Sequence, residues 1–202
     1  MSQIASQTLH DGRSQLSESE RARLWPVLDE LSDPEIPVVT LREMGIVRDL
    51  RRGADGVLEV VITPTYSGCP AMEQIHDDIV ARLAREGVAA RVVTQLAPAW
   101  TTDWMTPAAH EKLRAYGIAP PQCGSAQAGE AVIRFAPRKG AGAAGGTRAA
   151  ASKDAESALP AVPCPQCGST HTTETSHFGS TACKALYRCL DCLEPFDYFK
   201  PH

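Results

Sequence analysis

The chain has 202 residues, a formal net charge of −4 at pH 7 and a pI near 5.9. This length suits one ordinary domain and a small second one, and the mild acidic charge excludes a general nucleic-acid binder, which would carry a basic stripe. No segment approaches the roughly 18 continuous apolar residues of a membrane helix, and the polar residues 1–19 contain no signal sequence. We therefore expect a cytoplasmic protein without nucleic-acid or membrane partners.

The first predicted element, after a disordered tail at residues 1–19, is a helix. Ser17 and Glu20 have the spacing of a capping box, in which each side chain satisfies a backbone N–H at the start of a helix. Apolar residues continue at helical spacing as far as Leu31. Pro26 interrupts this run, so we expect the helix either to be kinked or to begin at Pro26.

A β-hairpin, a second helix and a third strand follow. The hairpin consists of residues 46–50 and 57–63 around an Asp-Gly turn signal, and its second strand is apolar on both faces, which predicts a central position. Residues 70–86 have an apolar stripe at helical spacing, and residues 91–96 supply the next strand. The order α-β-β-α-β predicts that residues 20–121 form a small α+β sandwich with its helices on one face of the sheet.

Composition changes at residues 122–161, which are rich in Ala and Gly and contain few large apolar residues. Such a segment cannot bury enough surface to order itself, so we predict a flexible linker. Residues 162–202 follow as a small β domain, with strands predicted at residues 170–177, 185–189 and 195–199.

Four cysteines of this last segment have the spacing of one metal site. They form two C-x-x-C pairs separated by 21 residues, Cys164 with Cys167 and Cys189 with Cys192. Each pair can place both thiolates on one side of a tight turn, and the hairpin between the pairs brings the two turns together around a tetrahedral ion. Because so short a domain buries little core, we expect a structural Zn²⁺ that completes a zinc ribbon.

Two other uses of the four thiolates stay open. Iron in the same site would make a rubredoxin-like electron carrier, although the second pair lacks the Pro and Gly that accompany the first. A zinc-ribbon adaptor for nucleic acid is the other alternative, and the few basic residues of the ribbon disfavour it. These residues are Lys184, Arg188 and Lys200.

Cys69 is the most informative residue of the first domain. Pro70 follows it at the start of the predicted helix, which gives Cys69 the N-cap position. Helix N–H groups and the macrodipole would lower its pKa there, and the thiolate could bind a metal or a cluster or act as a nucleophile. The alternative is a small, partly buried residue. Asp33 and Glu35 flank a proline and could face the same cleft, or serve only in a turn.

The remaining cysteines give a compartment but no role. Cys123 and Cys183 have no pair spacing, and we treat both as packed or spare thiols. Seven cysteines in all, four of them in metal spacing, indicate a reducing compartment rather than a disulfide framework.

Several motifs taken together resemble one family. Three segments of the first domain are similar to iron–sulfur cluster assembly factors: residues 33–38, 44–47 and 63–70. Three later segments extend the likeness to the D subunits (PaaD type) of bacterial phenylacetyl-CoA epoxidase systems: residues 116–121, 178–189 and 194–200. The resemblance covers nearly everything from Leu24 onward except the Ala/Gly segment, which departs from the family as an insertion.

The resemblance implies an accessory role in aerobic phenylacetate degradation, where a multicomponent di-iron monooxygenase epoxidises the ring of phenylacetyl-CoA. A PaaD-type chain would be a non-catalytic component that assists maturation of iron–sulfur or metal centres. Its partners would be the other subunits, above all the iron–sulfur and flavin reductase. Carried over to this chain, the resemblance makes Cys69 the thiol that reacts or contacts a transient iron–sulfur cluster, with Asp33 and Glu35 as its neighbours. The chain lacks the paired Glu-x-x-His helices of a di-iron oxygenase.

Overall fold

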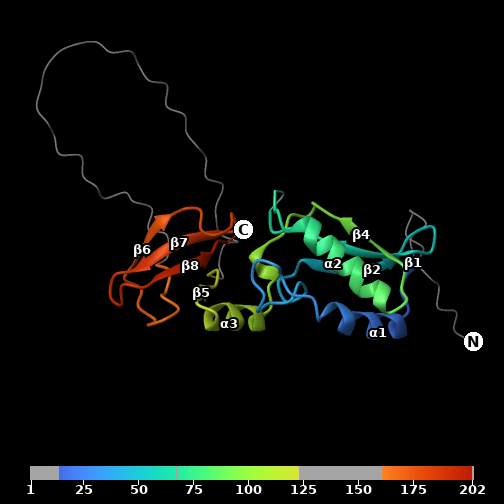
Figure 1. The fold of residues 1–202 in the computed structure, drawn as a ribbon, viewed down its shortest axis with the longest axis horizontal. Coiled ribbons are helices and arrows are strands. Elements are labelled where there is room, and N and C mark those ends of the chain that lie inside the picture. Colours follow the sequence, from blue (N-terminus) through green and yellow to red (C-terminus); the bar gives the residue numbers. More distant parts are fainter. Residues whose placement is uncertain (1–13, 67, 123–160, 202) are drawn as a thin grey trace, which may run out of the picture.

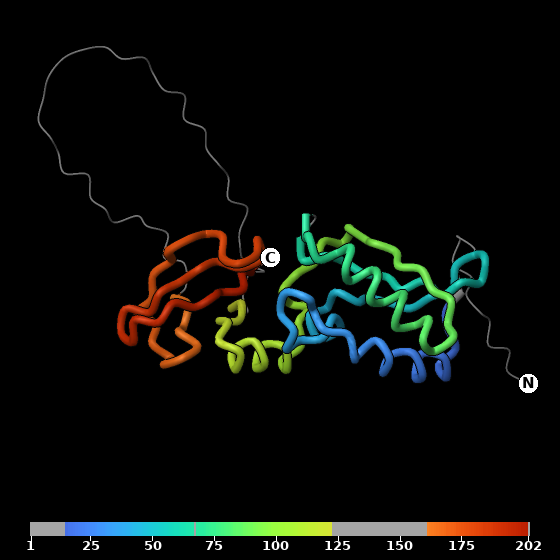
Figure 2. The backbone as a smooth tube through the Cα atoms, viewed as in Figure 1, coloured from blue at the N-terminus to red at the C-terminus, as the bar shows by residue number. Residues whose placement is uncertain are grey.

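The computed structural model describes residues 14–66, 68–122 and 161–201, which form two units side by side along the long axis of the molecule (Figures 1 and 2). The first unit is a sheet covered by helices, and the second is a smaller sheet that contains the four paired cysteines. The predicted fold class, an α+β domain followed by a β zinc ribbon, is confirmed.

The sheet of the first unit has the order β1-β2-β3-β4. Its antiparallel part is β1, β2 and β3, and β4 pairs with β3 in parallel. All five residues of β3 are buried, as expected of the apolar strand predicted to lie centrally. The bounds are β1 (Ser14–Gln15), β2 (Val47–Arg52), β3 (Leu58–Ile62) and β4 (Ala90–Thr94).

Two helices, α1 (Glu18–Leu28) and α2 (Met72–Arg85), pack with this sheet, and Figure 1 shows α2 lying across it. The predicted apolar stripe of α2 faces the core, since Ile75, Ile79 and Leu83 are each at most 1% exposed. The buried side chains of α1 belong to the same core. Periodicity in the sequence therefore predicted both the helices and their buried faces.

The start of the chain corrects two predictions. The Ser17–Glu20 capping box is present, but α1 begins at Glu18 and contains Pro26 rather than beginning there. The tail predicted at residues 1–19 is too long, because Ser14–Gln15 pairs with β2 and Leu16 is buried. Backbone pairing at an open sheet edge, which the local sequence does not show, orders this segment. Residues 1–13 lie outside the described residues.

Between the sheets the chain forms η1 (Thr102–Trp104), α3 (Pro107–Ala115) and β5 (Ile118–Ala119). Thr106 caps α3 as predicted, with its hydroxyl accepting from the Ala109 N–H at 3.2 Å. The short strand β5 pairs in parallel with the last strand of the ribbon. The predicted boundary at residue 121 is therefore not a clean division, because β5 belongs to the ribbon sheet.

The ribbon sheet has the order β5-β8-β7-β6, and its three later strands match the predicted ones. They are β6 (Thr172–Ser176), β7 (Lys184–Cys189) and β8 (Pro195–Phe199). Most of the predicted linker, residues 123–160, lies outside the described residues, and so does Cys123. The two described ends of that linker meet, because the Gln122 side-chain amide donates to the Ala161 carbonyl oxygen at 2.6 Å.

Candidate metal centre and thiols at the junction

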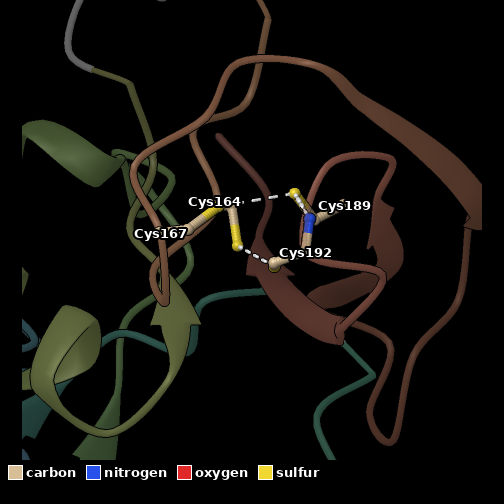
Figure 3. A group of neighbouring side chains, drawn as sticks. All are labelled: Cys164, Cys167, Cys189 and Cys192. Carbon is tan, nitrogen blue, oxygen red and sulfur yellow. Dashed lines mark hydrogen bonds between the residues drawn. The ribbon is translucent and has the colours of Figure 1, made fainter.

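The four paired cysteines come together on two turns that face each other (Figure 3). Their sulfur atoms all lie within 4.8 Å of one another. Two cross-turn separations are 3.8 Å, between Cys164 and Cys192, and 3.6 Å, between Cys167 and Cys189. A tetrahedron with metal–sulfur bonds of about 2.3 Å has edges of about 3.8 Å. The described thiols therefore already have the spacing of a four-cysteine metal site.

Each turn is shaped by backbone contacts. In the first, the Cys164 N–H donates to the Ser169 carbonyl at 2.8 Å and the Gly168 N–H donates back to the Cys164 carbonyl at 2.9 Å. The residue after the second cysteine has a left-handed conformation in both turns, with φ of 75° at Gly168 and 68° at Leu193. Glycine adopts this conformation without strain, whereas leucine does not. The two turns thus share one geometry although only the first has the expected glycine.

Polar contacts around the thiols prepare them for a cation. The Cys192 N–H donates to the Cys189 sulfur at 3.5 Å, and this bond is the main reason that the pKa of Cys189 is lowered to about 6. Asp191 of the second turn binds Ser169 and His171 of the first, the latter with 3.0 Å between Nδ1 and Oδ1. These contacts hold the two turns in register, and hydrogen bonds of this kind orient the ligands of protein metal sites.

Cys69 is not the N-cap of α2, so that prediction is wrong. The helix begins at Met72, its N-cap is Ala71, and this N-cap makes no side-chain capping bond. The Cys69 N–H donates to the Tyr66 carbonyl at 3.2 Å, so Cys69 belongs to a turn that precedes the helix. Pro70 marks the neighbourhood of a helix start, but the tertiary packing delays the first helical residue.

The predicted low pKa of Cys69 is also wrong. Burial of the half-buried thiol is the largest effect and raises its pKa to about 11. The N–H of Ala71 donates to the sulfur and opposes this rise, while the nearby charges of Glu35, Asp33 and Cys183 add to it. Desolvation and like charges together exceed one backbone hydrogen bond, so Cys69 is a protonated thiol at neutral pH.

Asp33 serves the turn that was its alternative interpretation. Its Oδ1 accepts the N–H groups of Glu35 at 2.8 Å and of Ile36 at 3.0 Å. Asp33 is only 8% exposed, and burial raises its pKa despite these bonds. Glu35 is half-buried, its pKa is raised chiefly by burial, and the Thr181 hydroxyl donates to its carboxylate. The two acids therefore lie within electrostatic range of Cys69, as the resemblance implies.

Sequence reasoning missed two buried residues of the ribbon. Cys183 is 5% exposed and Lys184 is 4% exposed, and both interact electrostatically with Asp33 or Glu35 across the boundary between the units. The Lys184 Nζ lies 3.3 Å from Asp197 Oδ2. Neither residue has a spacing signal. Their only sequence signal is that they lie in segment 178–189, one of those that carry the family resemblance.

Comparison with known proteins gives the family. Residues 148–200 match the family described as PaaD zinc beta ribbon domain, and residues 21–94 match the family described as Iron-sulfur cluster assembly protein. A protein of Escherichia coli (strain K12), the D component named "Putative 1,2-phenylacetyl-CoA epoxidase", is 46% identical over 178 residues, which are 88% of this chain and 90% of that protein. The chain belongs to the PaaD family of epoxidase subunits.

Two other similarities concern the first unit. A protein of Porphyromonas gingivalis (strain ATCC BAA-308 / W83), named "Fe-S protein maturation auxiliary factor", is 32% identical over 82 residues, covering 40% of this chain and 77% of that protein. A crystal structure of a domain of unknown function from Bacillus anthracis matches with a TM-score of 0.43 and 25% identity, over 48% of this chain and 92% of that one.

Family membership and geometry agree on the ribbon. As a PaaD-family chain, the protein has a zinc-ribbon domain whose four cysteines form a metal site. Membership in a family of epoxidase subunits also implies partner subunits. Among the described residues, no helix is long and apolar enough to cross a membrane.

Proposed function

We propose that this protein is a non-catalytic accessory subunit that helps to mature an iron–sulfur or metal centre of a phenylacetyl-CoA epoxidase system. The observation that supports this most directly is the placement of Cys69, half-buried beside Glu35 and Asp33 at the boundary between the two units. The P. gingivalis relative of the first unit, named as a maturation factor, supports the same role. The partner of greatest interest is the reductase of the system, which carries an iron–sulfur cluster and flavin.

The ribbon contributes structure in this proposal. Its thiolates would hold Zn²⁺, which has no redox chemistry and no geometric demand beyond the tetrahedron already present. A ribbon with so small a core depends on its metal for folding. The metal would therefore fix the surface that docks a partner, and would leave the chemistry to Cys69.

The chemistry assigned to Cys69 is transient binding of iron–sulfur cargo. Clusters in proteins are held by cysteine thiolates, so cargo would displace the Cys69 proton and take the sulfur as a ligand. A thiol with a pKa of about 11 is a poor nucleophile at neutral pH, which favours cargo binding over covalent catalysis. The raised pKa also favours release, because the proton returns readily when the cargo leaves.

The test is coexpression of Cys69→Ser with the remaining subunits of the epoxidase system. We expect a reductase that lacks most of its iron and acid-labile sulfide, and a correspondingly inactive system. Cys123→Ser, which alters another unpaired cysteine, serves as the control and should give a loaded reductase. Unchanged metal content of the Cys69→Ser ribbon shows that the fold is retained. A fully loaded, active reductase alongside Cys69→Ser would contradict the proposal.

A further inference from the structure

The ribbon completes the core of the first unit rather than merely standing beside it. Phe199, in β8, is 1% exposed and belongs to the buried cluster of the first unit, with its ring 6.0 Å from that of Trp100. Cys183 belongs to the same cluster, and Cys69 packs against it. The Lys200 N–H donates to the Cys183 carbonyl at 3.0 Å, which fixes this part of the backbone. Figure 1 shows the C-terminal end of the ribbon between the two units.

A chain of polar contacts crosses this junction. The Glu35 carboxylate, on the first unit, accepts from the Thr181 hydroxyl of the ribbon. The Thr181 Oγ1 in turn lies 3.0 Å from the Cys183 sulfur. Thr181 therefore links an acid of the first unit to a thiol of the second, and the Cys183 side chain is directed toward this boundary.

The Cys69 and Cys183 thiols share one environment. A charge on Cys183 raises the pKa of Cys69, and both thiols together with Glu35 raise the pKa of Tyr66 beyond the effect of its burial. Tyr66 begins the turn that holds Cys69. The two sulfurs thus approach the same region from two different units, although they are 114 positions apart in the sequence.

The junction also offers space and an unused polar group. A cavity of about 460 Å³ opens there, lined by Glu35, Lys184 and Asp197 among others. On the other side, the Thr63 hydroxyl, at the start of the segment that leads to Cys69, is buried and has no hydrogen-bond partner among the described residues. A buried hydroxyl without a partner is uncommon and indicates an unfilled interaction.

We propose that Cys183 is the second thiol ligand of the cargo site that Cys69 begins, so that iron–sulfur cargo is held between the two units. This inference rests on the proposed function and specifies its site. Glu35 and Asp33 are the carboxylates beside the two sulfurs. The ribbon metal contributes indirectly, because it orders the strand that positions Cys183.

The spacing of the groups favours a cluster over a single ion. Among the described residues, only the four ribbon cysteines form a group of three or more ligands whose atoms lie within 4.8 Å of one another. The junction groups are more widely spread than that cage. A binuclear or larger cluster separates its ligands more widely than one ion does, and two protein thiolates leave some of its iron positions for a donor or an acceptor. Incomplete ligation suits cargo that must be passed on.

The experiment is anaerobic reconstitution of the full chain, with its ribbon metal bound, using ferrous iron and sulfide. Bound acid-labile sulfide per chain and visible sulfur-to-iron absorption are measured for the wild type, Cys69→Ser, Cys183→Ser and Cys123→Ser. We expect Cys69→Ser and Cys183→Ser each to lose roughly tenfold or more of the bound sulfide at limiting iron, and Cys123→Ser to match the wild type. Cys183→Ala, which preserves apolar packing, replaces the serine variant if that variant loses its ribbon metal.

The outcomes separate this inference from the proposed function. Loss in Cys69→Ser with wild-type binding in both Cys183 variants overturns the role of Cys183 and leaves Cys69 as the cargo thiol. Wild-type binding in all variants, or no sulfide bound by the wild type, overturns the junction site. In that last case the reductase coexpression test still decides whether Cys69 takes part in maturation by another route.

Discussion

The ribbon and the junction both gather cysteines, but they hold them differently. In the ribbon, two turns present four sulfurs within 4.8 Å, and backbone N–H groups favour the thiolate. At the junction, Cys69 and Cys183 come from separate units, burial raises the pKa of both, and acids rather than N–H groups surround them. A permanent ligand set is thus built from local turns, whereas the junction thiols stay protonated until a cation displaces the proton.

The largest expected effect comes from removing a ribbon ligand. Cys164→Ser leaves three thiolates, so the chain should lose its ribbon metal and β6, β7 and β8 should lose hydrogen-exchange protection, because the small core depends on the metal. The first unit should stay folded but melt at a lower temperature, since it loses packing by Phe199 and Cys183. Cys123→Ser is the control. Full protection of the ribbon in metal-free Cys164→Ser would show that the metal is dispensable.

The next effect measures the coupling of the two units. Phe199→Ala removes a ring that is 1% exposed and should lower the free energy of unfolding by about 3 to 5 kcal/mol. Because that ring belongs to the core of the first unit, chemical denaturation should show both units destabilised together. Leu190→Ala, on a side chain 43% exposed, should change stability by less than about 0.5 kcal/mol. A shift confined to the ribbon would show that the units unfold independently.

Alkylation distinguishes the junction thiol from an activated one. A pKa of about 11 leaves Cys69 with roughly a hundredth of the thiolate of an ordinary cysteine at pH 7, and its higher intrinsic nucleophilicity recovers only about tenfold. Iodoacetamide should therefore modify Cys69 about tenfold more slowly than in the denatured chain, with the rate still rising above pH 9. Peptide mapping by mass spectrometry follows the site. Glu35→Gln removes a charge that raises this pKa, so it should speed the reaction, and a plateau below pH 8 would contradict the assignment.

The smallest expected effect concerns the unmatched turn of the ribbon. Leu193 has a φ of 68° and is 58% exposed, so Leu193→Gly should relieve backbone strain at little cost in buried surface. We expect a gain of about 1 kcal/mol in the free energy of unfolding of the metal-bound chain. Gly168→Ala, at a φ of 75° with open space around it, should lose a similar amount. Thermal unfolding checks both, and a loss of stability in Leu193→Gly would show that the leucine side chain matters more than the strain.

The sequence determined what depends on local spacing. Periodicity predicted α2 and its buried stripe, alternation and turn signals predicted the hairpin and the ribbon strands, and paired spacing predicted the four metal thiols. The Cys69 prediction failed in its electrostatics, because a proline next to a cysteine suggests a helix start but says nothing about burial or about Glu35 and Asp33 nearby. Desolvation depends on the whole surrounding fold, and so does the pKa.

Only the tertiary structure decided how the two units share their parts. The pairing of β5 with β8, the burial of Phe199 in the first unit and the approach of Cys183 to Cys69 all join segments far apart in the chain. No period or motif spacing records such contacts, because they follow from how two folded surfaces fit together. The sequence by itself identified the family and the ribbon's four ligands, and the packing of the units placed a second thiol beside the first.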